Sequence, residues 1–429
     1  MFGFANFLLL ALFAAAVFDL IFALARGGGL RGALHSLWNT PHLLFGQQLA
    51  EWRLQLGRIL FAAGLAAYEI SVVFCNSMAR QNWAWVQGVM SPVLEWLAFL
   101  CFGAKILFGT RYTWRELLAG GALYFIARWV YFNSQNIWWI GIVVAVLAAK
   151  DVPLRRPLQV YFASGCAAMA VVLALHFAGI VAPDLTSERM GALRGTYGYG
   201  HPNTFGGLVF GLVLAYALLR AQKVRWVDCL LVFAVGVFLL VGPASRSAAL
   251  CTLALAVGLV FCRLRTGHSV PRWWPGTCAG MVGLTAAVSY LLPLLVIKVG
   301  PWNNDIGPVW LAKLDSLLTC RISLTWMAYR LLDVKIAGQV FNWPTVDNSF
   351  AFALFQFGPV VAALLGILFA AALWGHAKQG RRVEVCCLFA MLAYAYMEVQ
   401  PFHLTTNPTA LLLCGAVFAQ TSARWQKIE

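Results

Sequence analysis

Long, nearly uncharged segments constrain the fold of this chain more than any other feature. The first covers residues 3–25, and similar segments recur as far as residue 422. A helix of about 20 residues crosses the hydrocarbon core of a bilayer, which is ~30 Å thick. Because lipid offers the backbone no hydrogen-bond partners, a crossing segment is either a helix or a strand of a closed barrel. Barrel strands would be short and would alternate in polarity, a pattern that this sequence lacks.

The composition agrees with helical spans. Hydrophobic residues make up 61% of the chain and charged residues 11%, whereas about 25% of the residues of a soluble domain are charged. We therefore predict an all-α polytopic integral membrane protein with about 12–13 transmembrane helices. The 11 cysteines show neither zinc nor disulfide spacing, which indicates small packing residues.

The basic residues predict the orientation of the chain. Its formal charge is +15, and most lysines and arginines lie in alternate loops, which the positive-inside rule assigns to the cytoplasm. The C-terminus is therefore expected in the cytoplasm, and the charge needs no nucleic-acid partner. A smaller set of arginines lies on the outward side. Among them, Arg194, Arg246 and Arg321 each belong to a patterned stretch.

Residues 194–206 form the first of these stretches and read RGTYGYGHPNTFG. Its glycines let the backbone turn tightly and approach a ligand closely. Pro202 suits the first turn of a helix, and Asn203 or Thr204 can cap that helix. The N-terminus of a helix beside Arg194, with His201 and Asn203 adjacent, is suited to binding an anion. The alternative is a glycine-rich turn that only caps the following span.

Two stretches contain the other outward arginines. Residues 242–248 read GPASRSA, a turn in which Arg246 with its serine neighbours either binds phosphate or extends to the membrane edge. Residues 313–330 place most apolar side chains on one helical face, which predicts an amphipathic helix on the outer membrane surface. Asp315 and Arg321 are the candidate polar residues of that helix.

Two further stretches bring acidic and imidazole groups to the outer ends of expected spans. Residues 346–358 contain Asp347 and Asn348, and residues 396–408 contain Glu398 and His403. An ionisable group at the depth of Glu398 is either functional or paired with a nearby arginine. For His403, in a turn, the alternative is a solvated side chain.

The order of these stretches resembles that of a known family. RGTYGYGHPNTFG, SRSA, LDSLLTCRIS and VDNSF, in this order, resemble the bacterial O-antigen and capsule polysaccharide polymerases (Wzy-type), which are related to the O-antigen ligases. The Gram-positive capsule and exopolysaccharide branch, with LLTGR-like and FGQ-like stretches, is the most similar. Here these stretches read LLTCR, ending at Arg321, and AGQ, ending at Gln339, so Cys320 and Ala337 depart from the pattern. The resemblance covers residues 190–408.

The resemblance implies a fold, an activity and partners. It implies a GT-C-like glycosyltransferase that acts at the outer face of the bacterial cytoplasmic membrane, by inverting, metal-independent transfer without a cofactor. The donor is a glycan on undecaprenyl diphosphate, and the acceptor is one lipid-linked repeat unit. Membrane lipid, chain-length regulator proteins and flippase proteins are the implied partners. Residues 1–181 are then N-terminal helices, 182–422 the catalytic region with outer loop 298–346, and 423–429 a cytoplasmic tail.

The polar residues fit the implied chemistry. A diphosphate leaving group needs positive charge, and the sequence has neither a DxD motif nor a metal-ligand cluster. Arginines bind phosphate with two parallel hydrogen bonds and stay charged. We therefore expect the diphosphate site to contain Arg194, Arg246, Arg321, Asn203 and Asn348. The attacking hydroxyl needs a proton acceptor. The candidates, with the first two ranked highest, are Asp347, His201, Glu398 and His403.

Two other functions remain open. A ligase would transfer the lipid-linked glycan to a different acceptor, and the sequence does not separate it from a polymerase. A flippase or transporter of lipid-linked glycans belongs to a different class, and it would carry charges within its spans and inverted repeats. The unusual charges gather on one face and no internal repeat is evident, which favours an enzyme.

Overall fold

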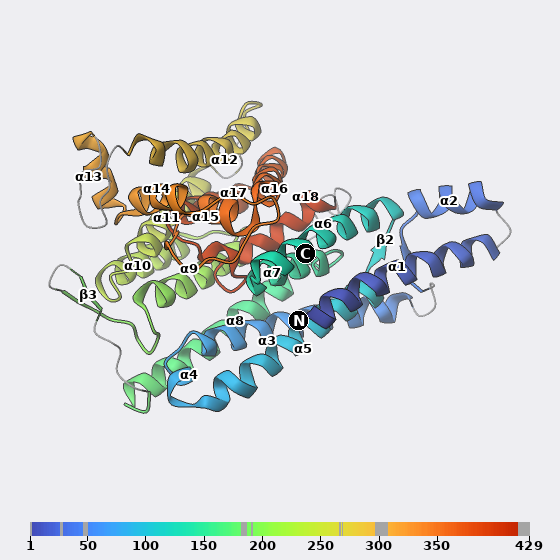
Figure 1. The fold of residues 1–429 in the computed structure, drawn as a ribbon, viewed down its shortest axis with the longest axis horizontal. Helices are drawn as coiled ribbons and strands as arrows, with labels where there is room; N and C mark the ends of the chain where they lie inside the picture. Colours follow the sequence, from blue (N-terminus) through green and yellow to red (C-terminus); the bar gives the residue numbers. More distant parts are fainter. Residues whose placement is uncertain are drawn as a thin grey trace. The chain divides into compact units, whose positions relative to one another are not determined.

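Helices form most of the described part of the chain in the computed structural model (Figure 1). The described residues are 2–25, 29–45, 50–181, 187–189, 192–265, 267, 269–296 and 308–418. Within them, strands occur only as two short antiparallel pairs. These are β1 (His42–Leu43) with β2 (Arg111–Tyr112), and β3 (Ser187–Arg189) with β4 (Ala192–Arg194).

Eight helical segments of the described residues are long and apolar enough to cross a membrane. They are Gly3–Ala25, Ala50–Cys75, Val86–Phe108, Arg155–Phe177, Pro202–Leu219, Arg246–Leu264, Trp274–Leu295 and Pro359–Lys378. Three shorter apolar helices are Ile137–Ala148, Trp226–Val241 and Pro408–Val417. The chain is thus a helical multi-pass membrane protein, as its composition predicted.

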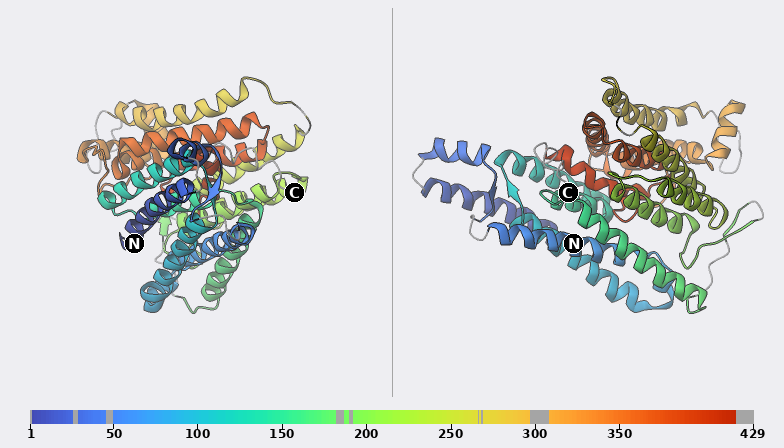
Figure 2. Two further views of the ribbon diagram at one scale, coloured as in Figure 1. Left: turned by 90° about the vertical axis from the view of Figure 1, so that its right-hand side faces the viewer. Right: turned by 180° about the vertical axis from the view of Figure 1, so that it is seen from behind.

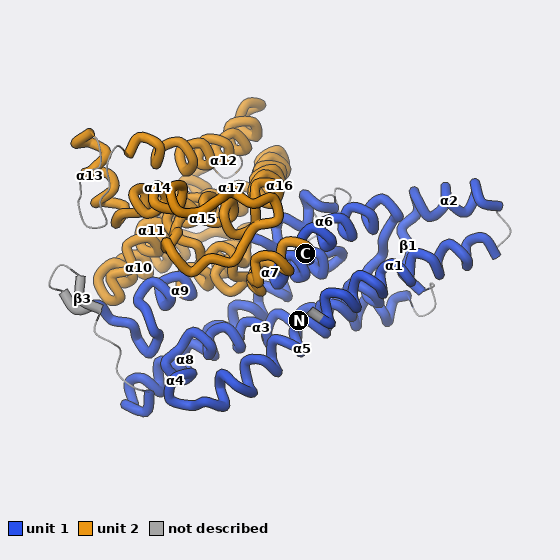
Figure 3. The backbone as a smooth tube through the Cα atoms, viewed as in Figure 1, with its two compact units in different colours: residues 1–128, 140–208, 410–429 blue, residues 129–139, 209–409 orange. Residues whose placement is uncertain are grey.

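The helices belong to two compact units, coloured separately in Figure 3. Unit 1 consists of residues 1–128, 140–208 and 410–429. Its helices are α1 (Phe2–Ala25), α2 (Gly29–Asn39), α3 (Ala50–Cys75), α4 (Ala79–Asn82), η1 (Val86–Met90), α5 (Ser91–Phe108), α8 (Arg155–Phe177) and α18 (Cys414–Val417). It also holds most of α6 (Trp114–Ser134) and α7 (Ile137–Ala148), part of η5 (Pro408–Leu413) and the start of α9 (Pro202–Leu219).

Helix α3 is the centre of unit 1 and packs against α5 and α8. Small residues allow the close approach to α5. A Cβ atom on Gly57 would lie 2.8 Å from the Cα of Gly109, and one on Gly64 would lie 2.8 Å from the ring of Phe102. Contacts of this kind are typical of helices that pack within a membrane, where small residues let two backbones approach.

Unit 2 consists of residues 129–139 and 209–409. Its helices are α10 (Trp226–Val241), α11 (Arg246–Leu264), α12 (Trp274–Leu291), η2 (Leu292–Leu295), α13 (Val309–Leu317), α14 (Arg321–Leu331), α15 (Ser349–Phe352), η3 (Ala353–Phe357), α16 (Pro359–Lys378), α17 (Arg382–Met397) and η4 (Gln400–Phe402). The pairs α10 with α11, α11 with α17, and α12 with α16 pack along one another, and Figure 2 shows these helices from two further sides.

Helices α11 and α17 run antiparallel. The Sγ atoms of Cys262, near the end of α11, and Cys386, near the start of α17, are 3.5 Å apart. The start of α11 is correspondingly close to the end of α17, where the functional residues of unit 2 gather.

The amphipathic helix expected over residues 313–330 is interrupted. Helix α13 ends at Leu317 and α14 begins at Arg321, because Thr319 and Cys320 have φ angles of 57° and 64°. The amide of Cys320 donates to the carbonyl oxygen of Asp315 at 2.8 Å, which closes the end of α13. Periodicity alone did not reveal this break, since the apolar positions continue through it.

The expected span that starts at residue 347 is also divided. Residues 349–357 form the short helices α15 and η3, and the long helix α16 starts only at Pro359. Gly358 separates them with a φ angle of 87°, and a Cβ atom there would lie 2.1 Å from the carbonyl oxygen of Ile336. Gly338 is constrained in the same way, since its Cβ would lie 2.1 Å from the carbonyl oxygen of Gln356.

Two expected segments lie partly or wholly outside the described residues. Of the outer loop 298–346, the structure describes the part from residue 308 onwards, and the tail 423–429 lies beyond the last described residue, 418. The division of the chain at residues 181 and 182 stays a prediction.

Candidate functional site

A buried ion pair links two of the patterned stretches in unit 2. The Nη2 atom of Arg321 lies 2.6 Å from the Oε1 atom of Glu398. The two residues are 7% and 4% exposed, so little water reaches the pair. A charge buried at this depth is tolerated because a partner of opposite charge compensates it. The sequence predicted that Glu398 is either functional or paired with an arginine, and the pairing is confirmed.

Arg321 is held by further acceptors. Its guanidinium donates to the carbonyl oxygen of Leu318 at 2.9 Å and to the Oγ atom of Ser247 at 3.3 Å. It also donates to the carbonyl oxygen of Met397 and to the hydroxyl of Thr319. Acceptors from three separate parts of unit 2 therefore fix the position of this cation.

Local capping explains why Arg321 lies where it does. Arg321 is the first residue of α14, and the preceding Cys320 has a left-handed backbone conformation. The carboxylate of Asp315 accepts hydrogen bonds from the amides of Ile322 at 2.7 Å and Ser323 at 3.2 Å. Asp315 is 0% exposed and so serves as a cap of α14, which orients the first turn of that helix.

The stretch VDNSF holds the chain around Glu398 from the other side. Asn348 caps α15 and donates its amide to the carbonyl oxygen of Tyr396 at 3.1 Å and to the hydroxyl of Ser289 at 3.0 Å. The hydroxyl of Ser349 donates to the carbonyl oxygen of Glu398 at 2.5 Å. Asn348 is 4% exposed, and the hydrogen bonds of its side chain hold the residues next to Glu398 in position.

Asp347 lies beside the ion pair. Its side chain is partly buried, and its charge acts on Glu398 in opposition to Arg321. Ser247 also forms a hydrogen bond with the Glu398 carboxylate. Two carboxylates therefore share the neighbourhood of one guanidinium. Repulsion between two nearby carboxylates favours protonation of one of them, a condition that suits a proton acceptor.

Arg246 is at the start of α11, next to Ser247. Its side chain is exposed, in agreement with either expectation for this residue. No side chain caps α11, and the buried hydroxyl of Ser245 has no hydrogen-bond partner in the described part of the chain. The first amides of α11 are thus oriented as in other helix N-termini that bind anions.

His403 lies in a more buried place than a solvated turn. Its ring centroid is 3.7 Å from that of Trp138, and the side chain is partly buried. Burial lowers the pKa of His403 to about 3. The imidazole is therefore neutral at physiological pH, and the solvated alternative is wrong.

The RGTYGYGHPNTFG stretch lies in unit 1 up to residue 206. The guanidinium of Arg194 donates to the side-chain oxygen of Asn203 at 2.9 Å. The amide of Asn203 donates to the Nδ1 atom of His201 at 3.1 Å, so His201 caps α9, and the expected cap by Asn203 or Thr204 is wrong. With Nδ1 as acceptor, a neutral His201 carries its proton on Nε2 and presents a donor.

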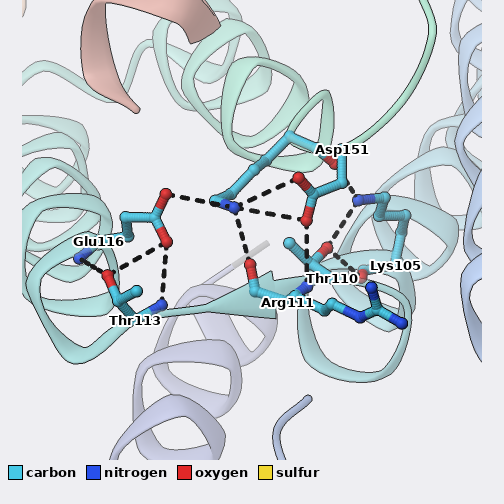
Figure 4. Close-up of polar contacts among 7 residues, drawn as sticks. Lys105, Thr110, Arg111, Thr113, Glu116 and Asp151 are labelled. Carbon is cyan, nitrogen blue, oxygen red and sulfur yellow. Dashed lines mark hydrogen bonds and ion pairs between the residues drawn. The ribbon is translucent and has the colours of Figure 1, made fainter. Parts of the chain in front are cut away.

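A second polar cluster, which we did not predict from the sequence, lies in unit 1 and is drawn in Figure 4. The Nζ atom of Lys150 lies 3.3 Å from Glu116 and 3.3 Å from Asp151, and it donates to the carbonyl oxygen of Arg111 at 2.7 Å. The Nζ atom of Lys105 donates to the hydroxyl of Thr110 at 2.6 Å.

This Lys105–Lys150 cluster is balanced in charge. Both lysines are almost fully buried, and both have acceptors within the cluster. Such a network joins the ends of α5, β2, α6 and α7, and it stabilises their arrangement. The sequence held one signal for it, because Lys105 falls within an apolar span.

The described residues hold no arrangement suited to a metal ion, and the chain matches no family model. In the described part of the chain, no group of three or more His, Cys, Asp or Glu side chains is arranged to hold a metal ion. No family model, curated protein or solved structure matches the chain.

Proposed function

We propose that the chain is a glycosyltransferase that joins undecaprenyl-diphosphate-linked oligosaccharide repeat units at the outer face of the bacterial cytoplasmic membrane. The observation that carries the proposal is the buried pair of Arg321 and Glu398, with Asp347 beside it. Arg321 and Asp347 come from two of the four stretches that resemble the polysaccharide polymerases, and Glu398 lies within residues 190–408, which the resemblance covers. A GT-C-like arrangement of 12–13 spans, the outward site and the cytoplasmic C-terminus belong to the same proposal.

The reaction needs one cation and one base. The hydroxyl of the acceptor sugar attacks the anomeric carbon of the donor glycan from the face opposite the diphosphate, so the configuration inverts. The bond to undecaprenyl diphosphate breaks, and the leaving group takes the electron pair. A fixed arginine near the developing charge is worth about 2.7–4 kcal/mol of transition-state stabilisation, by analogy with other preorganised donors. A carboxylate accepts the hydroxyl proton.

The contacts of Arg321 support an order in which the cation binds diphosphate first and the base then accepts the proton. In the absence of substrate, Glu398 and Ser247 occupy the Nη2 atom of Arg321. An incoming diphosphate oxygen is a stronger competitor for this atom than a serine hydroxyl, because it is charged. When diphosphate takes one of these bonds, Glu398 loses compensation and becomes a better proton acceptor. The negative charge of Asp347 repels that of Glu398, which also makes Glu398 a better proton acceptor.

Other predicted residues receive refined roles. Arg246, with the uncapped start of α11, is suited to contact a phosphate oxygen. His201 is suited to donate a hydrogen bond to an anion rather than to accept a proton, because its Nδ1 atom caps α9. A neutral, partly buried His403 positions Trp138 and is a weaker candidate for the base.

The test uses purified protein in detergent with a synthetic lipid-diphosphate oligosaccharide. A product ladder that rises by whole repeat units, read by mass spectrometry, supports the polymerase. The ladder should vanish in Arg321→Gln and persist in Arg330→Gln, a matched change on the same helix, where the side chain only covers the ring of Trp326. EDTA should leave the ladder unchanged. An intact ladder in Arg321→Gln would remove the proposed role of this residue.

Two alternatives are separated by the same preparation. Transfer only after a different acceptor is added identifies an O-antigen ligase-type enzyme. A flippase or transporter of lipid-linked glycans is the second candidate, and one observation favours it: Glu69 and Lys105 are buried within the spans α3 and α5. In that case the protein in vesicles moves a labelled lipid-linked glycan between leaflets and forms no new glycosidic bond.

A further inference from the structure

Glu69 is an acidic residue within a span that the proposed reaction does not use. It lies in α3, six residues before the end of the helix at Cys75, or about 9 Å along the axis. The residue is 2% exposed. It makes no hydrogen bond or ion pair with another residue of the described chain, and burial alone affects its ionisation. No basic side chain of the described residues therefore compensates a charge on Glu69.

Hydroxyl and thiol groups of unit 1 surround this carboxyl group. Glu69 interacts electrostatically with Tyr68 on its own helix, and with Tyr161 and Cys166 on α8. It also interacts with Tyr199, and burial raises the pKa of that phenol. From α5, the carboxyl group of Glu95 acts on Tyr68. All these neighbours are neutral or acidic.

Two buried hydroxyls of the loop 195–200 lack hydrogen-bond partners within the described residues. The Oγ atom of Thr196 and the hydroxyl of Tyr199 are buried and make no hydrogen bond within the described residues, and the two residues are 1% and 0% exposed. A buried hydroxyl without a partner costs about 1–3 kcal/mol. Both belong to the loop of residues 195–200, in the RGTYGYGHPNTFG stretch.

The loop 195–200 is fixed to the helices that surround Glu69. The amide of Met78, beyond the end of α3, donates to the carbonyl oxygen of Gly198 at 2.8 Å, and Ser77 forms a bridge with Tyr199. Gly198 has a φ angle of 83°, and a Cβ atom there would lie 3.1 Å from the Cβ of His176 on α8. The Nδ1 atom of His176 is also buried without a hydrogen bond.

We propose that Glu69, Thr196 and Tyr199 form a proton-binding site beneath the loop 195–200. An ionised carboxylate that is buried in a membrane without a cation is costly, so the group binds a proton. The protonated acid has one O–H donor and a carbonyl acceptor. The unpartnered hydroxyls of Thr196 and Tyr199 complement these groups through a bridging water.

The proton-binding site is linked to the loop that carries Arg194 and His201. A movement of the loop that exposes Glu69 to water lowers the cost of ionisation and releases the proton. By linkage, proton binding and loop movement affect each other equally. A coupling of this proton to diphosphate binding rests on the proposed function, whereas the proton site itself does not.

The experiment is infrared difference spectroscopy of the full chain in lipid nanodiscs at neutral pH, without substrate. The spectrum of wild type minus Glu69→Gln should contain the C=O band of a protonated carboxylic acid. Wild type minus Glu95→Gln, a matched change on α5, should lack the Glu69 band, because both proteins contain Glu69 and its band cancels. Tyr199→Phe and Thr196→Val should each shift the frequency of this band, because a hydrogen-bond partner is lost. A solely structural role of the two hydroxyls would leave the frequency unchanged.

Each outcome decides the proposal. If Glu69→Gln removes a carboxylate band and no acid band, Glu69 is ionised in the wild-type protein, and the proposal is overturned. An acid band that appears only when Na⁺ is removed identifies a cation as the occupant, and also overturns it. If Glu69→Gln does not fold, Tyr199→Phe tests the proposal instead. A shift in the frequency of the acid band supports the proposal, and an unchanged frequency overturns it. Failure of glycosyl transfer leaves the acid band in place, so the two proposals fail separately.

Discussion

Removing the two charges of the buried ion pair together should restore stability but not activity. Arg321→Met leaves Glu398 buried without a cation, which costs about 3–5 kcal/mol of unfolding free energy. Glu398→Gln keeps the shape and removes the charge. Its cost is smaller, about 1.5–3 kcal/mol, because Arg321 keeps its bonds to Leu318, Met397, Thr319 and Ser247.

The double variant should be more stable than the sum of the single changes predicts. Coupling between contacting residues is typically about 0.5–3 kcal/mol. Turnover behaves differently, since the leaving diphosphate still lacks its cation, and we expect a loss of about 100–1,000-fold in both Arg321→Met and the double variant. The assays are detergent unfolding followed by circular dichroism and the single-turnover rate of ladder formation.

The ion pair of Arg111 and Glu51 provides a control. The Nη2 atom of Arg111 lies 3.2 Å from the Oε1 atom of Glu51, and the two side chains are 33% and 83% exposed. Exposed pairs contribute little, so Glu51→Gln should cost less than about 1 kcal/mol and leave turnover unchanged. If the double variant of Arg321 and Glu398 regains turnover together with stability, the pair is structural and the catalytic argument is refuted.

Three further predictions use other parts of unit 2. Gly338→Ala should lower the unfolding free energy by more than about 3 kcal/mol, since the new Cβ atom would overlap the Gln356 carbonyl at 2.1 Å. Gly380→Ala, with a similar φ angle but its nearest contact at 3.4 Å, should cost only about 1–2 kcal/mol, and equal costs would contradict the overlap. Cys320 is exposed, so a membrane-impermeant maleimide should label it from the outer side in intact cells, and labelling only after lysis would reverse the predicted orientation. The pKa of His403 falls from 6.5 to about 3 on folding, so the unfolded chain binds more protons between these values and stability falls as the pH drops through this window. His403→Gln should flatten this dependence, measured as unfolding free energy at pH 4 to 7, and an unchanged slope would contradict the assigned pKa.

The sequence was sufficient to predict a helical membrane protein, because long segments of low charge satisfy their backbone hydrogen bonds in lipid by forming helices. It also singled out stretches of unit 2 that the structure brings into contact. It did not predict which arginine pairs with Glu398, because 77 residues separate Glu398 from Arg321 and only the tertiary fold of unit 2 brings the start of α14 to the end of α17. Local patterns cannot report contacts of this kind.

The break between α13 and α14 shows the same limit at short range. Apolar periodicity continues across residues 318–320, so it predicted one helix, yet Thr319 and Cys320 have positive φ angles. A glycine at position 320, as in the LLTGR-like pattern, would adopt this conformation without strain. The backbone conformation at this position thus favours glycine, and the cysteine found there is strained. The turn places Arg321 at the start of α14, so the position of the cation depends on a strained residue that carries no charge.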